Sequence, residues 1–169
     1  KATAKSATGV PVEKAVRSSA FIYIVLSLMM IGSASGFVPF LPSYASSLGA
    51  SLTFAATLAG VSQIGTLVGK NTLGAISDRN TPAAVTIGAG ISVAGLLFML
   101  FFGSSSTLIM QIGAAMFGMI YASATVLNPL VVIDAFGIRE YTKIQARISL
   151  INGVINAAMQ SLWGFIADL

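Results

Sequence analysis

Three long stretches free of charged residues constrain this chain more than any other feature of its sequence. They run from Ser18 to Gly69, from Pro82 to Ile133 and from Ile148 to Ala167. Only 8% of the 169 residues are charged and 56% are hydrophobic, whereas about a quarter of an average soluble domain is charged. So few charges could not cover the surface of a compact soluble domain, so we expect an integral membrane protein surrounded by the lipid bilayer.

Turn-rich sequence divides the first two stretches, and five membrane-spanning helices are therefore predicted. Each has about the 20 residues that cross the hydrocarbon core of a bilayer. The predicted spans are Ala20–Leu41, Leu52–Ile76, Ala83–Phe102, Leu108–Ile133 and Gln145–Ala167. The polar connections between them are Pro42–Ser51, Ser77–Pro82, Gly103–Thr107 and Asp134–Ile144. Such short connections make consecutive helices antiparallel, and the runs are too long for barrel strands, so we expect an all-α polytopic membrane helical bundle.

The basic residues predict the orientation of this bundle, because all nine lie on the same side of it. They are Lys1, Lys5, Lys14, Arg17, Lys70, Arg79, Arg139, Lys143 and Arg147. By the positive-inside rule, the N-terminus and the second and fourth connections face the cytoplasm of a cell (inner) membrane. Residues 1–18 are expected to be a cytoplasmic linker, followed by a five-span bundle at 19–169. This placement accounts for the net charge of +4 without a nucleic-acid partner.

The residue types that most enzymes need are missing from the sequence. There is no Cys and no His, which excludes disulfides, the usual zinc sites and imidazole acid–base relays. No phosphate-binding Gly-x-x-x-x-Gly-Lys-Ser/Thr string occurs, and no charged residue lies near the middle of a predicted span. We therefore expect no enzyme activity, no metal and no cofactor, and a membrane enzyme is the least favoured reading.

One string in the second connection resembles a family motif. Residues 69–79 read GKNTLGAISDR, similar to the loop motif of the major facilitator superfamily, in which a Gly, a basic residue, a second Gly and an Asp-Arg pair occur between two helices. Residues 80–83 (NTPA) differ from the Gly and further basic residues that follow in the family. The resemblance implies a conformational latch formed by Gly69, Lys70, Gly74, Asp78 and Arg79. In such a latch the carboxylate accepts hydrogen bonds from a neighbouring helix N-terminus, while the alternative is a simple solvated turn.

The resemblance continues outside this motif. Residues 38–42 (VPFLP) and 48–51 (LGAS) look like the start of the C-terminal half of such a carrier. Residues 136–141 (FGIREY) look like the loop before the eleventh helix in the monocarboxylate and oxalate–formate branches. This implies helices seven to eleven of twelve, built as a half with inverted three-helix repeats. The implied partner is the N-terminal half of the same carrier, and a small organic anion is one implied solute.

Two predicted helices carry small residues before a proline near their C-terminal ends. The first has Gly32 and Gly36 before Pro39, and the fourth has Gly118 before Pro129. Because these helices run in opposite directions, the pattern agrees with an inverted-topology repeat. A proline kinks a membrane helix, so both prolines are candidates for gating. The alternative is that the glycines form static packing seams.

A polar stripe on the last predicted span indicates a binding cavity. Asn152, Asn156 and Gln160 recur at i, i+4 and i+8 and therefore lie on one face of the helix. Carboxamides that face lipid are costly, so these side chains face either a cavity or a neighbouring helix. Other candidates for the same cavity are Gln63, Thr66, Tyr121, Thr125 and Asn128.

The function expected from these features is secondary active transport of a small solute by alternating access, as part of a larger carrier. The polar stripe would contribute to the choice of solute. The alternative is a self-contained five-helix membrane scaffold or partner-binding protein without transport activity, which glycine packing seams would suit equally well.

Overall fold

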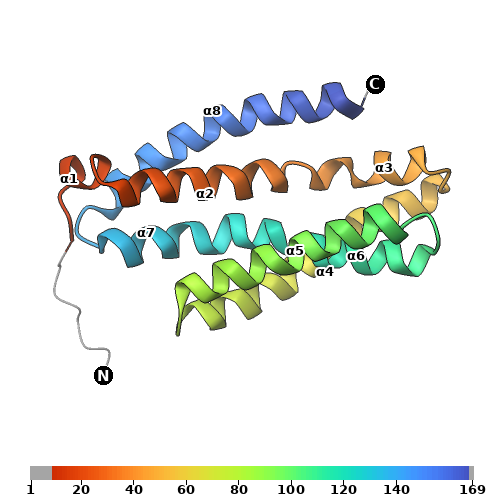
Figure 1. Cartoon of the computed structure of the whole chain (residues 1–169), viewed down its shortest axis with the longest axis horizontal. Coiled ribbons are helices and arrows are strands. Elements are labelled where there is room, and N and C mark those ends of the chain that lie inside the picture. The colour runs from red at the N-terminus through yellow and green to blue at the C-terminus, as the bar shows by residue number, and fades with distance from the viewer. Residues whose placement is uncertain (1–8, 168–169) are drawn as a thin grey trace.

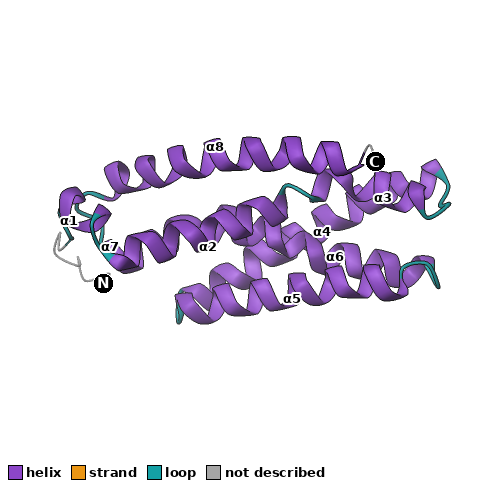
Figure 2. Cartoon of the chain, turned by 45° about the horizontal axis from the view of Figure 1, so that its top comes forward, coloured by secondary structure: helices purple, strands orange, loops and turns teal. Residues whose placement is uncertain are grey.

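The computed structural model of the chain describes residues 9–167, and these form an elongated all-helical bundle (Figure 1; Figure 2). The α-helices are α1 (Val12–Val16), α2 (Ser19–Ser35), α3 (Leu41–Ser47), α4 (Leu52–Ser77), α5 (Thr81–Phe102), α6 (Thr107–Ala122), α7 (Asn128–Phe136) and α8 (Tyr141–Ala167). A 3-10 turn, η1 (Val38–Phe40), joins α2 to α3, and a π-helical turn, η2 (Ser123–Leu127), joins α6 to α7. The predicted all-α fold is confirmed.

Four segments of the described chain are long and apolar enough to cross a membrane, which is one fewer than predicted. They are Ser19–Ser47, Leu52–Ser77, Thr81–Phe102 and Thr107–Phe136. The fifth predicted span is present as α8, a helix of 27 residues, but it is not among the four. Its four carboxamides and two basic residues make it less apolar than the others. It nevertheless runs beside α2 for most of its length (Figure 1).

The first and fourth spans include Pro39 and Pro129, as predicted, and both continue past their predicted ends. Pro39 and Pro42 lie in the first turn of η1 and α3 respectively, where a helix has no use for the missing N–H. The first rod therefore extends from the predicted Leu41 to Ser47. In the same way, the fourth span extends past Asp134 to Phe136, where Gly137 ends it at a φ of 77° that favours glycine.

Helix α6 packs most extensively against α4 and α5, and glycines bring the backbones into contact. A Cβ added to Gly65 of α4 would collide with the carbonyl of Ala115, and one added to Gly118 of α6 would collide with the carbonyl of Ser62. The Thr66 hydroxyl donates to the Gly118 carbonyl across this crossing at 2.9 Å. Small residues that allow such an approach are the usual basis of helix packing in membranes.

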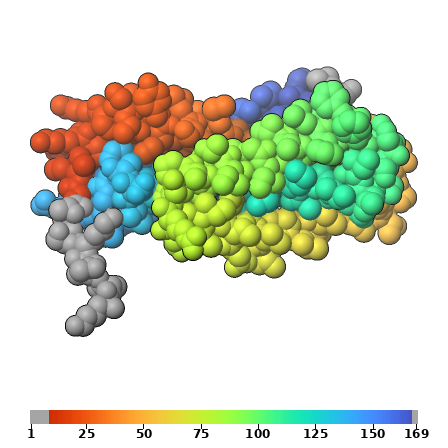
Figure 3. All heavy atoms as spheres, turned by 60° about the horizontal axis from the view of Figure 1, so that its bottom comes forward, coloured from red at the N-terminus to blue at the C-terminus, as the bar shows by residue number. Residues whose placement is uncertain are grey.

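The α5–α6 crossing is also built on glycines. A Cβ on Gly95 would lie 2.7 Å from the carbonyl oxygen of Gly113, and a Cβ on Gly113 would lie 2.9 Å from the carbonyl oxygen of Gly95. In the space-filling view, α4, α5 and α6 lie together over the centre and right of one face, beside α2 at the upper left (Figure 3). Helices α4, α5 and α6 thus form a close-packed group.

Residues 9–18, which we expected to belong to a linker, are folded against the α7–α8 connection. The backbone N–H of Val10 donates to the Phe136 carbonyl at 3.0 Å, and that of Val12 donates to the Glu140 carboxylate at 2.6 Å. The bond from Val12 holds the pKa of Glu140 below its ordinary value. Val12 and Ala15 of α1 are buried in the core. The assignment of residues 1–18 as a cytoplasmic linker stays a prediction, and residues 1–8 lie outside the described part.

Positive charge gathers at one end of the bundle. Segment α1, the α4–α5 connection and the α7–α8 connection lie toward the left in Figure 1, and the α3–α4 and α5–α6 connections lie at the right. These left-hand segments and the nearby turns of α4 and α8 carry Lys14, Arg17, Lys70, Arg79, Arg139, Lys143 and Arg147. Lys1 and Lys5 lie outside the described residues. The charge asymmetry is thus a property of the fold, and its orientation in a membrane stays a prediction.

Candidate functional site

A cavity of about 270 Å³ lies between α2, the α6–η2 rod and α8. It is lined by Leu28, Gly32, Ser35, Gly36, Pro39, Tyr121, Ala124, Thr125, Asn128, Asn152, Asn156 and Gln160. Six of the eight side chains that the sequence suggested for a cavity therefore meet here, namely Tyr121, Thr125, Asn128, Asn152, Asn156 and Gln160. None of the lining residues carries a charge.

The carboxamides of α8 reach the cavity because α2 presents glycines to them. A Cβ added to Gly32 would lie 2.8 Å from both terminal atoms of the Asn156 carboxamide, and one added to Gly36 would lie 3.5 Å from Cγ of Gln160. Near the far end of α8, the Trp163 indole N–H donates to the Ser33 carbonyl at 3.1 Å. Sequence reasoning gave these glycines a packing role and missed that they make room for polar side chains.

Several polar atoms at this site are buried without a partner. Among the described residues, Oδ1 of Asn152, Oδ1 of Asn156 and Oε1 of Gln145 have no hydrogen-bond donor, and Asn152 is only 6% exposed. Nε2 of Gln145 donates to Oδ1 of Asn128 at 3.1 Å. A hydrogen bond between α8 and α7 therefore joins the Gln145 and Asn128 side chains. The carboxamide oxygens of Asn152 and Asn156 remain without a donor. Gln145 was not among the predicted residues, although it lies one helical turn before Ser149 and the polar stripe.

Both helix interruptions lie at the same cavity. Pro39 removes the N–H that the Ser35 carbonyl would otherwise accept, and Pro129 removes the one that the Thr125 carbonyl would accept. Ser35 and Thr125 both line the cavity, as does Pro39, whereas Pro129 follows η2 just outside it. A π-helical turn such as η2 is frequent at functional sites. Whether these breaks act as gates stays a prediction.

The two remaining cavity candidates are on α4, at other places in the bundle. Gln63 is exposed and does not line the cavity. Thr66 is 4% exposed, and its hydroxyl donates to the carbonyls of Ser62 and Gly118. Thr66 therefore contributes to the α4–α6 crossing. Periodicity identifies the polar face of a helix but does not say which neighbour covers that face.

The residues of the proposed latch surround the end of α4. Gly69 packs on α6, where an added Cβ would lie 2.8 Å from Cβ of Ala122, whereas an added Cβ on Gly74 meets nothing within 4 Å. Lys70, Asp78 and Arg79 are exposed. The N-terminus of α5 is capped by Asn80, whose Oδ1 accepts from the backbone N–H of Ala83 at 3.0 Å. The side chain next to this N-terminus is thus Asn80, and the role of Asp78 stays a prediction.

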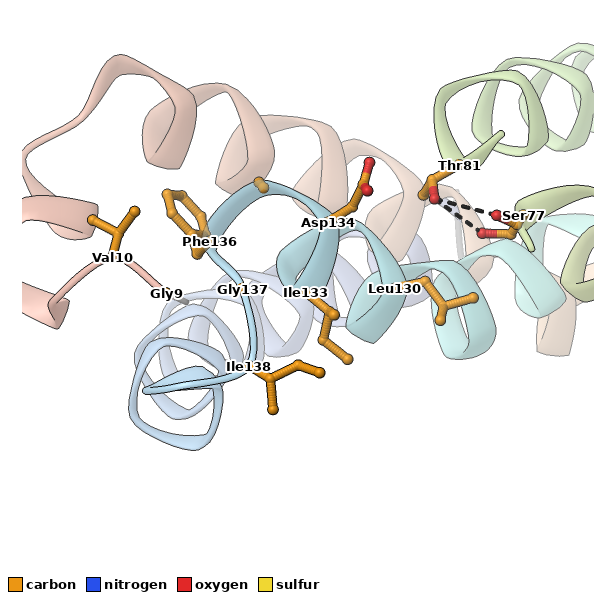
Figure 4. Close-up of a pocket in the computed structure, with 11 residues that line it drawn as sticks. Gly9, Val10, Ser77, Thr81, Leu130, Ile133, Asp134, Phe136, Gly137 and Ile138 are labelled. Atoms are coloured by element: carbon orange, nitrogen blue, oxygen red, sulfur yellow. Dashed lines mark hydrogen bonds between the residues drawn. The ribbon is translucent and has the colours of Figure 1, made fainter. Parts of the chain in front are cut away.

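A second cavity, of about 480 Å³, lies beside the latch at the positively charged end of the bundle (Figure 4). Ser77 and Thr81, which bracket the α4–α5 turn, are joined by a hydrogen bond between their hydroxyls at 3.4 Å. Asp134 on the last turns of α7 and residues 9–10 of the N-terminal segment complete the walls. Three separate parts of the chain therefore meet around this space.

A comparison with protein families decides where the chain belongs. The family model described as Major Facilitator Superfamily matches residues 2–168. The chain belongs to the major facilitator superfamily. No curated protein and no solved structure matched it. The resemblance seen in the 69–79 string is confirmed, and the chain is a multi-pass membrane protein of a transport family. The narrower resemblance to the monocarboxylate and oxalate–formate branches stays a prediction.

Proposed function

We propose that this chain forms part of a secondary active carrier that moves a small solute by alternating access. The cavity between α2, α6–η2 and α8 would be its contribution to the solute pathway. The observation that carries this proposal is the grouping of uncharged polar side chains around an opening where two membrane helices are interrupted. Interrupted helices beside midplane binding sites are a recurring feature of secondary transporters.

The polar surface around the cavity supports a partner bundle on this side. Tyr121 is 42% exposed, and Thr125, Ser149 and Gln160 are also exposed. Polar side chains facing lipid are costly, so this face meets water or other protein. By contrast, the exposed side chains elsewhere include Leu67, Phe101 and other large apolar residues suited to lipid. We propose the N-terminal half of the same carrier as the structure that faces the cavity.

The packing supports a movement in which two groups of helices shift relative to each other. Glycine contacts hold α4, α5 and α6 together, while α2 and α8 are interrupted or polar where they border the cavity. Pro39 and Pro129 would allow bending at these points, and the Asp78 latch would favour one packed state at the cytoplasmic end. The glycine seams are occupied within the bundle, so they are not free to hold the partner of a scaffold protein.

The solute is small, and this wall of the cavity provides no charged side chain to bind an ionised one. A small organic anion, as the branch resemblance implies, would need a cation, and none of the lining residues is charged. Lys70 and Arg147 are exposed and do not line the cavity. Transport of an anion would therefore rely on a cation from the other half. We place the carrier in the cell (inner) membrane with the N-terminus of this chain in the cytoplasm.

The test is a carboxamide substitution in the full-length carrier reconstituted into proteoliposomes. Asn156→Leu removes the polar group but keeps a similar volume, and Asn71→Leu is the matched control. Asn71 is exposed on α4 and donates only to Leu67 of its own helix. Uptake should fall with Asn156→Leu and persist with Asn71→Leu, at equal amounts of inserted protein. Unchanged uptake in Asn156→Leu would remove the cavity from the solute pathway.

A further inference from the structure

We infer that the α8 wall of this cavity recognises the hydroxyl groups of an uncharged solute, such as a polyol or a monosaccharide. The inference rests on the proposed function, since it names the solute class for the same cavity. It differs from the organic anion that the branch resemblance implies, and it follows from the chemistry of the cavity wall.

The first argument is the set of acceptors without donors. Oδ1 of Asn152 and Oδ1 of Asn156 are buried at the cavity and accept no hydrogen bond from the described residues. Asn152 is 6% exposed, so bulk water does not solvate it freely. Buried polar atoms in proteins almost always have a partner. A solute that brings hydrogen-bond donors would supply it.

The second argument is the helix breaks, which add further acceptors to the same wall. Pro39 and Pro129 have no N–H to donate to the carbonyls four residues before them, those of Ser35 and Thr125, and both residues line the cavity. Neither hydroxyl side chain is free to act as a donor, because Ser35 donates to the Gly32 carbonyl and Thr125 donates to the Tyr121 carbonyl. The wall is therefore rich in oxygen atoms that accept.

The third argument is the lack of charge. A carboxylate has only acceptor atoms at neutral pH, so it could accept from the carboxamide N–H groups but could not donate to the free oxygens of Asn152 and Asn156, and no lining residue offers a cation. A hydroxyl group both donates and accepts, and a carboxamide offers both an acceptor oxygen and two N–H donors. Hydroxyl groups thus match both the donors and the acceptors of this wall, whereas carboxylates match only its donors.

The volume of this half of the cavity is compatible with such a solute. The cavity measures about 270 Å³, just below the roughly 300–1,000 Å³ of typical ligand pockets. One sugar-sized molecule or a short polyol fits this scale. A site that bonds a hydroxyl group discriminates strongly against analogues that lack it, because its own polar groups would be left without partners.

The experiment measures uptake of four radiolabelled probes by the full-length carrier in proteoliposomes. Xylitol and D-glucose represent uncharged polyhydroxyl solutes, and lactate and oxalate represent carboxylates. We expect saturable uptake of at least one of the first pair, above that of liposomes without protein. Asn152→Leu should lower this uptake about tenfold at low probe concentration, since one hydrogen bond is lost. Asn152→Asp keeps an acceptor oxygen and should retain more uptake than Asn152→Leu.

Controls separate recognition from folding. Asn71→Leu should transport like the wild type, and gel filtration should show that each variant is monodisperse. Saturable uptake of lactate or oxalate without uptake of xylitol or glucose would overturn the inference and still support transport. Equal uptake of xylitol or glucose by Asn152→Leu and wild type would also overturn it. If no probe enters faster than in liposomes without protein, the inference is overturned, whereas the transport proposal is decided by the uptake test with Asn156→Leu described above.

Discussion

The glycine contact between α4 and α6 allows a sharp test of the packing. Alanine at Gly65 would place its Cβ against the Ala115 carbonyl, and alanine at Gly118 would place it against the Ser62 carbonyl. In both cases the obstacle is backbone, which cannot rotate away as a side chain can. The two helices would have to move apart, and the Thr66 hydrogen bond to Gly118 would lengthen from its 2.9 Å.

The size of the effect follows from three terms. Overpacking a tight contact costs about 1–3 kcal/mol, and loss of a hydrogen bond between membrane helices adds roughly 0.6 kcal/mol. Against this, alanine favours a helix over glycine by about 1 kcal/mol. Gly60→Ala is the matched control, because Gly60 is exposed on the same helix and an added Cβ there meets nothing within 4 Å. Gly65→Ala should therefore be less stable than Gly60→Ala by about 2–4 kcal/mol.

The assay is thermal unfolding of the purified variants in detergent or nanodiscs. In a domain of this size each kcal/mol shifts the midpoint by about 2–4 °C, so Gly65→Ala should unfold on the order of 5–15 °C below Gly60→Ala. Gly118→Ala should behave like Gly65→Ala, since it probes the same contact from the other helix. If all three variants unfold within about one degree of each other, the backbones of α4 and α6 are not in contact and the packing described above is wrong.

Three further predictions concern the cavity, a helix cap and the N-terminal segment. Gly32→Ala should displace the Asn156 carboxamide and lower solute uptake, whereas Gly153→Ala, where an added Cβ meets nothing within 4 Å, should leave uptake unchanged; equal uptake in both would contradict the described fit. Asn80→Ala removes the cap of α5 and should cost about 1 kcal/mol of stability, measured as the midpoint of thermal unfolding, and an unchanged midpoint would refute the cap. The pKa of Glu140 is lowered by its bond from Val12, so this bond stabilises docking of residues 9–17 above the ordinary Glu pKa of 4.5 and is lost as the pH falls through the lower folded value. Hydrogen exchange of the Val12 amide should accelerate over that pH range relative to neighbouring amides, and Glu140→Gln should weaken the same protection at neutral pH; a pH-independent exchange pattern would rule out the contact.

The sequence predicted which faces of the helices are polar, but it could not predict which of these faces border the candidate cavity. The i, i+4, i+8 spacing of Asn152, Asn156 and Gln160 required one polar face, and that face borders the cavity. The same reasoning could not separate Thr66 from Thr125, because each is a hydroxyl on a long apolar helix. Thr66 faces a glycine of α6 and bonds to its carbonyl, while Thr125 faces open space. Only the neighbouring helix decides between these roles.

The lengths of the first and fourth spans likewise depend partly on the sequence and partly on tertiary contacts. Apolar runs predicted where each helix lies, but Pro39 and Pro129 were expected near helix ends. In the structure both rods continue beyond them, through η1 into α3 and through η2 into α7. A proline removes one hydrogen bond, and packing against neighbouring helices can offset that loss. The sequence could locate the interruptions, and tertiary contacts determined that the helices resume.

The sequence by itself determined that the chain enters a membrane as antiparallel helices with its positive charge at one end. These properties depend on composition and order along the chain, since each helix satisfies its own backbone and each charge follows its connection. The tertiary structure decided which glycines meet a carbonyl, which carboxamide oxygens remain without a donor, and where two helix breaks come together. Those properties arise between segments far apart in the sequence, and local patterns carry no information about the distance between them.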